Sequence, residues 1–235
     1  MAVALPAVWR DNSRLSNSSQ NAKERTIYTL YWDRGGANMA SHAILEELGV
    51  PYEMVEIDLA KQMQRSAEYL AINPNGKVPT LRHQGQIVYE SAAILTYLLD
   101  QHPDSDLAPA TNSPLRGRYY QTLFWLSGTV QEAANRWAHP EQYTDAATAF
   151  AGIKASATTE LSRCWQLLDD NLKDSGPWLL GDKLSGADFH LFMIAWWSRR
   201  YDANALNWPQ LKRHTDAMLE RESVKRMIAQ EGLVL

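Results

Sequence analysis

The chain has 235 residues, 45% of them hydrophobic, which is enough for one large domain or two small ones. Its 23 Lys and Arg residues against 27 Asp and Glu give a net charge of −4, so we expect no nucleic-acid partner and no membrane partner. No apolar run approaches the roughly 18 residues that cross a bilayer, and the single cysteine, Cys164, excludes an internal disulfide and a dithiol redox motif.

The first 25 residues predict a disordered tail. Serine and asparagine dominate residues 11–25, and almost nothing apolar is available there for burial. The short apolar stretch at residues 2–8 has no basic segment before it, so we expect no secretory signal. A cytoplasmic protein is therefore predicted.

Residues 26–103 predict an α/β domain. Strands are expected where β-branched and aromatic residues run together or alternate with polar ones, and helices where apolar residues recur every three or four positions. In chain order the expected elements are strand 27–32, helix 39–48, strand 52–59, a weak helix near 64–70, hairpin strands 78–82 and 86–89, and a helix from Ser91 that ends before Pro103. Because a helix joins the first two strands, these strands should be parallel.

A polar linker at residues 104–113 precedes a predicted all-helical domain at 114–235. Apolar residues at spacings of three and four predict one long amphipathic helix over 115–137 and a second over 150–172. Cys164 falls on the core stripe of the second helix, where a buried and unreactive thiol is expected.

Ser185 and Asp188 predict the start of a further, centrally buried helix. The Ser185 hydroxyl can accept a hydrogen bond from the Asp188 N–H while the Asp188 carboxylate reaches back to the cap residue. We therefore interpret this pair as a structural cap rather than as catalytic residues.

Two motifs and the domain order carry a resemblance to a known family. Asn75-Gly76-Lys77-Val78-Pro79-Thr80-Leu81 is followed by Tyr89-Glu90-Ser91-Ala92-Ala93-Ile94, and then by the helical segment with its cap. In this combination the chain resembles the cytosolic glutathione S-transferase superfamily, in particular its bacterial members, over residues 26 to about 230. The resemblance implies an N-terminal thioredoxin-like βαβαββα domain followed by a C-terminal helical bundle domain, in a homodimer.

The resemblance also implies a glutathione-binding site. Glu90 offers a carboxylate for the ammonium of the ligand, and Ser91 offers a hydroxyl and an N–H at a helix start whose dipole favours the ligand's carboxylate. The main chain of Val78, before a cis-Pro79, would pair with the cysteinyl part like an added strand, and Lys77 belongs to the same motif. A plain helix cap is the alternative for Glu90 and Ser91.

The sequence departs from the family at the position that stabilises the thiolate. Family members carry Tyr, Ser or Cys there, whereas this chain places Ala37 where some bacterial members have cysteine and Asn38 where others have serine. Asn38 can donate its amide to a thiolate at a helix N-terminus, so we expect it to be the catalytic residue. A capping role for Asn38, and Tyr28 or Tyr31 as donors, are the alternatives.

The expected reaction is attack of the glutathione thiolate on a small hydrophobic electrophile or on a peroxide, as in detoxification, with disulfide reduction as a side activity. Glutathione is then a co-substrate. No metal is expected, because none of the six histidines lies three or four positions from another. Residues expected at the electrophile pocket, each with core packing as its alternative, are Trp32, Met39, Tyr119, Tyr120 and Trp125.

Two other functions fit the same residues. A non-catalytic glutathione-binding or protein-interaction module would share the fold and would explain the loss of a side-chain donor at Ala37. A glutathione lyase that cleaves aryl ethers would use the same site. The sequence does not separate either from the transferase.

Overall fold

The computed structural model describes residues 27–234, so the predicted tail at 1–25 lies outside the described residues. The described chain divides into two compact units. One contains residues 27–98 together with 226–234, and the other is Leu99–Lys225. The segment 226–234, which the helical periodicity grouped with the second domain, thus lies against the first unit.

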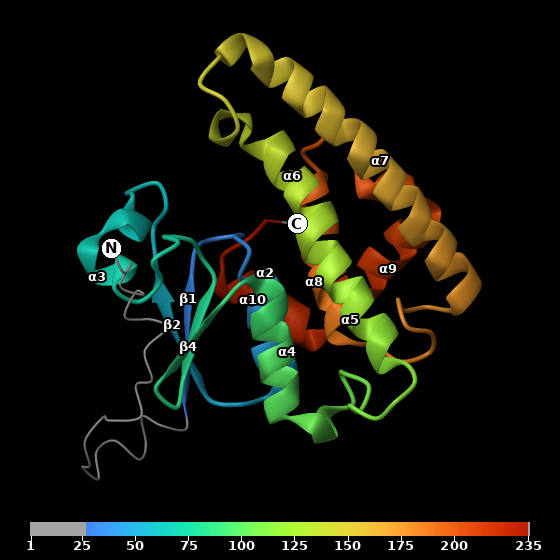
Figure 1. The fold of residues 1–235 in the computed structure, drawn as a ribbon. Coiled ribbons are helices and arrows are strands. Elements are labelled where there is room, and N and C mark those ends of the chain that lie inside the picture. Colours follow the sequence, from blue (N-terminus) through green and yellow to red (C-terminus); the bar gives the residue numbers. More distant parts are fainter. Residues whose placement is uncertain (1–26, 235) are drawn as a thin grey trace, which may run out of the picture. The chain divides into compact units, whose positions relative to one another are not determined.

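A four-stranded sheet organises the first unit, in the strand order β2-β1-β3-β4 (Figure 1). The strands are β1 (Tyr28–Trp32), β2 (Tyr52–Glu56), β3 (Thr80–His83) and β4 (Gln86–Tyr89). β1 pairs with β2 in parallel and with β3 in antiparallel orientation, and β3 pairs antiparallel with β4. This mixed sheet confirms the predicted thioredoxin-like class.

Helices α2 (Met39–Leu48), α3 (Ala67–Leu70) and α4 (Ser91–Gln101) complete the predicted order of this unit. α2 ends at Gly49, whose φ of 62° is the left-handed conformation that glycine adopts most easily. β3 begins at Thr80 rather than at residue 78, because Pro79 has no N–H to donate to a sheet. β2 ends three residues earlier than its alternating pattern predicts.

The second unit is all-helical, as predicted. Its helices are α5 (Arg116–Trp125), α6 (Gln131–Ala138), α7 (Phe150–Ser175), α8 (Gly186–Ser198), α9 (Pro209–Leu219) and the start of α10 (Glu222–Gln230). Short 3₁₀ turns of this unit occur at Pro103–Ser105, Pro140–Gln142, Ala147–Ala149 and Ala205–Asn207, and one of the first unit lies at Met63–Arg65. Cys164 is buried on α7.

The predicted continuous helix over 115–137 is divided in the structure. A π-helical segment, Leu126–Val130, separates α5 from α6. A π-helical turn takes up extra residues within an otherwise helical run. It leaves Leu126 and Val130 buried, as are Leu123 and Ala133 on either side of it, so the apolar spacing alone could not reveal the interruption.

Asp188, in the first turn of α8, is the centre of a buried set of hydrogen bonds. Its Oδ2 accepts from the Ser185 N–H at 2.8 Å and from the Ser185 hydroxyl at 2.9 Å. Its Oδ1 accepts from the Leu179 N–H at 2.9 Å and lies 3.1 Å from Nε2 of His214. The carboxylate therefore reaches back to the cap residue and also joins α8 to α9 and to the preceding loop.

His190, on α8, gives the stability of the chain a dependence on pH. The side chain is fully buried, its Nε2 lies 2.7 Å from Oε1 of Gln131, and burial lowers the pKa of His190 to about 3. Between about pH 6.5 and pH 3 the unfolded chain therefore binds a proton at His190 that the folded chain does not. Stability from this group is fully present above pH 6.5 and is lost as the pH falls.

We predict that lowering the pH from 7 to 5 costs the wild-type chain about 2 kcal/mol of unfolding free energy more than it costs the His190→Gln variant. Glutamine retains a donor for Gln131 but does not titrate. Chemical denaturation of both proteins at the two pH values gives the comparison. Equal losses in the two proteins would contradict the assignment to His190.

Candidate functional site

The N-terminus of α4 presents Glu90 and Ser91. The Glu90 side chain is exposed, and its φ of 74° is a conformation that non-glycine residues seldom adopt and that occurs preferentially at functional sites. The buried Ser91 hydroxyl donates to the carbonyl of Ala37 at 3.1 Å, which joins α4 to the segment ahead of α2. The first N–H groups of α4 have no acceptor within the helix and can bind an anion.

The Val78-Pro79 peptide bond is cis, and Val78 is half-buried. The main chain of Val78 makes no backbone hydrogen bond to any other residue between 27 and 234, so its N–H and C=O resemble those of a sheet edge. The preceding carbonyl, of Lys77, accepts from the Tyr69 hydroxyl at 2.7 Å and from Nδ2 of Asn73 at 2.9 Å. These two bonds fix the main chain next to Val78, while the Lys77 side chain is exposed.

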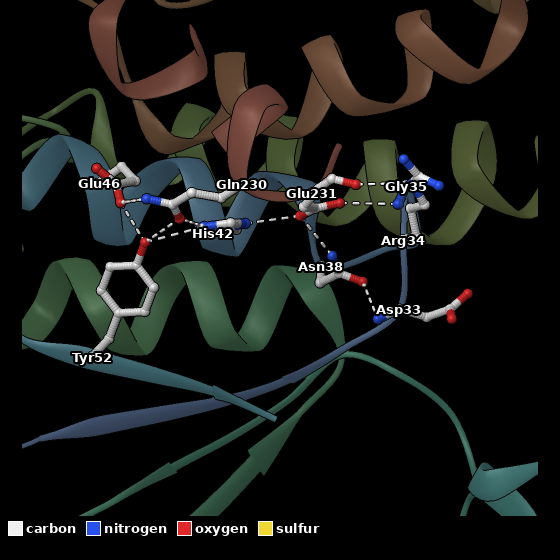
Figure 2. Close-up of polar contacts among 9 residues, drawn as sticks. All are labelled: Asp33, Arg34, Gly35, Asn38, His42, Glu46, Tyr52, Gln230 and Glu231. Carbon is white, nitrogen blue, oxygen red and sulfur yellow. Dashed lines mark hydrogen bonds and ion pairs between the residues drawn. The ribbon is translucent and has the colours of Figure 1, made fainter. Parts of the chain in front are cut away.

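The sequence predicts that Asn38 contacts the glutathione thiolate. In the structure its side chain is bonded to Asp33 and Glu231. Its side chain is fully buried just before α2 and makes no capping bond to the helix. Oδ1 accepts from the Asp33 N–H at 3.1 Å, and Nδ2 donates to Oε1 of Glu231 at 2.9 Å (Figure 2). In the structure the Asn38 side chain therefore links its own loop to the C-terminal segment, and its catalytic role stays a prediction.

The two tyrosines considered as alternative donors lie in the core of the first unit. Tyr28 is 3% exposed and stacks on His83 with the ring centroids 3.9 Å apart, and burial raises its pKa to about 12. Tyr31 packs with Ile57 and Tyr69. Both rings are therefore part of the core of the first unit.

The residues predicted for the electrophile pocket fall into two groups, one fully buried and one half-buried. Met39 and Tyr119 are fully buried. Met39 shares a helix face with Ala43, and Tyr119 shares one with Leu123, at the i, i+4 spacing of core positions. These positions agree with core packing, the alternative weighed for both, and a pocket role for them stays a prediction.

The remaining three pocket residues, Trp32, Tyr120 and Trp125, are half-buried and keep accessible surface. The Arg116 guanidinium lies 4.6 Å from the ring centroid of Tyr120. This cation–π contact fixes the ring from one side.

Within residues 27–234, no group of three or more His, Cys, Asp or Glu side chains is placed to hold a metal ion. In the same part of the chain, no helix combines the length and the apolar character needed to span a membrane.

The network around Glu231 was not anticipated from the sequence. Besides Asn38, it includes His42 on α2, at a distance of 2.8 Å between Nδ1 of His42 and Oε1 of Glu231. Both side chains are fully buried. A charged residue near the C-terminal end of a sequence gives no local signal of burial, so only the folded chain reveals this pair.

The mixed sheet followed by a helical unit has the architecture that the resemblance implies, and comparison with known families agrees. The model of the glutathione S-transferase N-terminal domain matches residues 28–100, and that of the C-terminal domain matches residues 149–222. The chain belongs to the glutathione S-transferase family.

Curated relatives match along nearly the whole chain. Glutathione S-transferase GstA of Escherichia coli O157:H7 is 29% identical over 212 residues, which cover 87% of this chain and 98% of GstA. The glutathione S-transferase-like protein gedE of Aspergillus terreus is 33% identical over 224 residues, which cover 84% of this chain and 93% of gedE.

Solved structures of glutathione transferases are also similar to this chain. A glutathione transferase homologue from Sulfitobacter with bound glutathione superposes with a TM-score of 0.81 at 27% identity, over 89% of this chain and 100% of the homologue. The ternary complex of BphK, a bacterial enzyme of the family, gives a TM-score of 0.78 at 31% identity, over 87% and 100% of the two chains.

Proposed function

We propose that this chain is a glutathione-dependent transferase that directs the glutathione thiolate onto a small hydrophobic electrophile or a peroxide. The observation that carries the proposal is the start of α4, where Glu90 has a positive φ beside a Ser91 that is bonded to the segment before α2. Glutathione bound to the Sulfitobacter homologue, at 27% identity, supports the choice of ligand.

Each end of the tripeptide has a complementary group in the first unit. The Glu90 carboxylate pairs with the ammonium of the γ-glutamyl end, and Ser91 with the first N–H groups of α4 binds its carboxylate. The unpaired main chain of Val78 binds the cysteinyl residue as a short added strand. The exposed Lys77 ammonium supplies a positive charge for the carboxylate at the other end.

A thiolate requires a donor, and we propose that the side chains at positions 37 and 38 do not supply it. A free thiol has a pKa of about 8.5 and is only a few per cent ionised at pH 7. Ala37 has no donor group in its side chain, and Asn38 is committed to Asp33 and Glu231. We therefore assign stabilisation of the sulfur to main-chain N–H groups and the helix dipole at the start of α2.

Turnover assays test the proposal. The purified chain with glutathione should convert a generic aromatic halide to its glutathione adduct, or reduce a hydroperoxide with formation of glutathione disulfide. The rate should depend on both substrates and should fall in the Ser91→Ala variant. Absence of turnover with an aromatic halide, a hydroperoxide and an aryl ether would contradict an enzymatic function of this site.

A non-catalytic glutathione-binding module is the second candidate, and the alanine at position 37 is the observation that favours it. Such a module would bind glutathione and show no turnover in any of the three assays. From the family resemblance we also propose that the chain acts in the cytoplasm as a homodimer.

A further inference from the structure

Glu231 inserts a carboxylate from the C-terminal segment into the loop that precedes α2, residues 33–38 (Figure 2). Its Oε2 accepts from the Gly35 N–H at 2.9 Å, and its Oε1 accepts from Nδ2 of Asn38 at 2.9 Å. Its main-chain carbonyl accepts from Nε of Arg34 at 3.0 Å. Three residues of the loop are therefore held by one residue.

His42, on α2, is the buried side-chain partner of the Glu231 carboxylate. Its Nδ1 lies 2.8 Å from Oε1 of Glu231, and its Nε2 lies 2.7 Å from Oε1 of Gln230 and 3.1 Å from the Tyr52 hydroxyl. Nε2 of Gln230 donates to Glu46, which turns the Gln230 oxygen toward His42. Both ring nitrogens of His42 therefore lie within hydrogen-bond distance of side-chain oxygens.

The loop that Glu231 holds is the one on which the proposed chemistry depends. Gly35 has a φ of 63°, so its N–H reaches Glu231 from a backbone conformation that favours glycine. At the other end of the loop, the Ala37 carbonyl accepts from Ser91. The carboxylate thus fixes the main chain between β1 and α2, where the thiolate would be stabilised.

We propose that Glu231 is a positioning residue for the thiol site. Through Gly35 and Asn38 it holds the start of α2 in the geometry that stabilises the thiolate, and the contact with His42 ties it to α2 itself. The inference rests on the proposed function. Because Glu90 and Val78 lie on other segments, loss of the Glu231 charge should impair the sulfur chemistry far more than it impairs affinity for the tripeptide.

The Glu231→Gln variant tests this directly, since glutamine preserves the size of the side chain and one acceptor oxygen but removes the charge. We expect kcat to fall roughly tenfold or more, because small displacements at a reacting centre have effects of that size. The KM for glutathione should stay within about threefold of wild type. The pH profile of kcat should shift toward higher pH, as expected for a less stabilised thiolate.

Arg226→Gln is the matched control. Nη2 of Arg226 donates to the Glu46 carbonyl at 2.9 Å, and its Nε bonds the Glu46 carboxylate, so this residue also joins α10 to α2. These two acceptors belong to Glu46 on α2, outside the 33–38 loop. We expect the kcat of this variant to stay within about twofold of wild type. An equal loss in both variants would indicate general loosening and would overturn the inference.

Amide hydrogen exchange measures, independently of activity, how firmly the 33–38 loop is held. Amides of residues 33–38 should exchange faster in Glu231→Gln than in the wild-type chain, and Arg226→Gln should match wild type. If Glu231→Gln does not fold, Asn38→Ala, which removes one donor to the carboxylate and the acceptor of the Asp33 N–H, should lower kcat and leave the glutathione KM unchanged. If the wild type is active and neither Glu231→Gln nor Asn38→Ala lowers kcat, this inference alone is overturned. An inactive wild type overturns the proposed function as well.

Discussion

Replacing Asp188 with alanine should lower the free energy of unfolding by about 3–5 kcal/mol. The carboxylate is fully buried, and its loss leaves the Leu179 and Ser185 N–H groups and Nε2 of His214 without their partner. Buried donors that lose a charged acceptor bear the full cost of desolvation. Equilibrium denaturation, followed by tryptophan fluorescence, measures the change.

Ser185→Ala is the control for this prediction. It removes one hydroxyl that donates to Asp188 at 2.9 Å and keeps the remaining contacts of the carboxylate. Loss of a cap side chain of this kind costs about 0.5–2 kcal/mol. A loss in Asp188→Ala no larger than that in Ser185→Ala would contradict the central role of the carboxylate.

Glu90→Gln and Ser91→Ala should each weaken glutathione binding at least about tenfold. Glutamine keeps the shape of Glu90 and removes the charge that pairs with the ligand's ammonium. Because Glu90 is exposed, its substitution should shift the melting temperature by no more than a few degrees. Ser91→Ala also loses the bond to Ala37, so its stability should fall by about 1 kcal/mol.

Glu53→Gln, an exposed carboxylate on β2, makes the same change in net charge away from α4. Its affinity for glutathione should equal that of wild type. Calorimetric titration of the three variants makes the comparison. Unchanged affinity in both Glu90→Gln and Ser91→Ala would remove the assignment of the γ-glutamyl end to α4.

The fold was predictable because its signals are local. The aromatic and β-branched run of β1, the stop at Gly49 and the motif around Pro79 each depend on neighbouring residues, and together they define the mixed sheet. The division of the long helix after Trp125 was not predictable, since the apolar spacing continues through the π-helical segment. The predicted ends of strands and helices differ from the observed ends by a few residues for the same reason, because the apolar pattern continues past the last backbone hydrogen bond of the element.

The candidate site was predictable only where its chemistry lies in short motifs. Glu90 and Ser91 follow a strand and open a helix, as the motif implies. The partner of Asn38 is 193 residues away, and no local pattern links the two. Burial of Met39 and Tyr119 likewise depends on which face of the helix meets the core, which an aromatic or flexible side chain alone does not determine.

Calorimetric titration of the wild-type chain with glutathione, and in parallel with the dipeptide cysteinylglycine, examines recognition of the γ-glutamyl group at the start of α4. The dipeptide retains the cysteinyl and glycyl residues and lacks the group assigned to Glu90 and Ser91. We predict that glutathione binds and that the dipeptide binds at least about tenfold more weakly. Equal affinity for the two peptides, or no binding of glutathione, would contradict the proposed site.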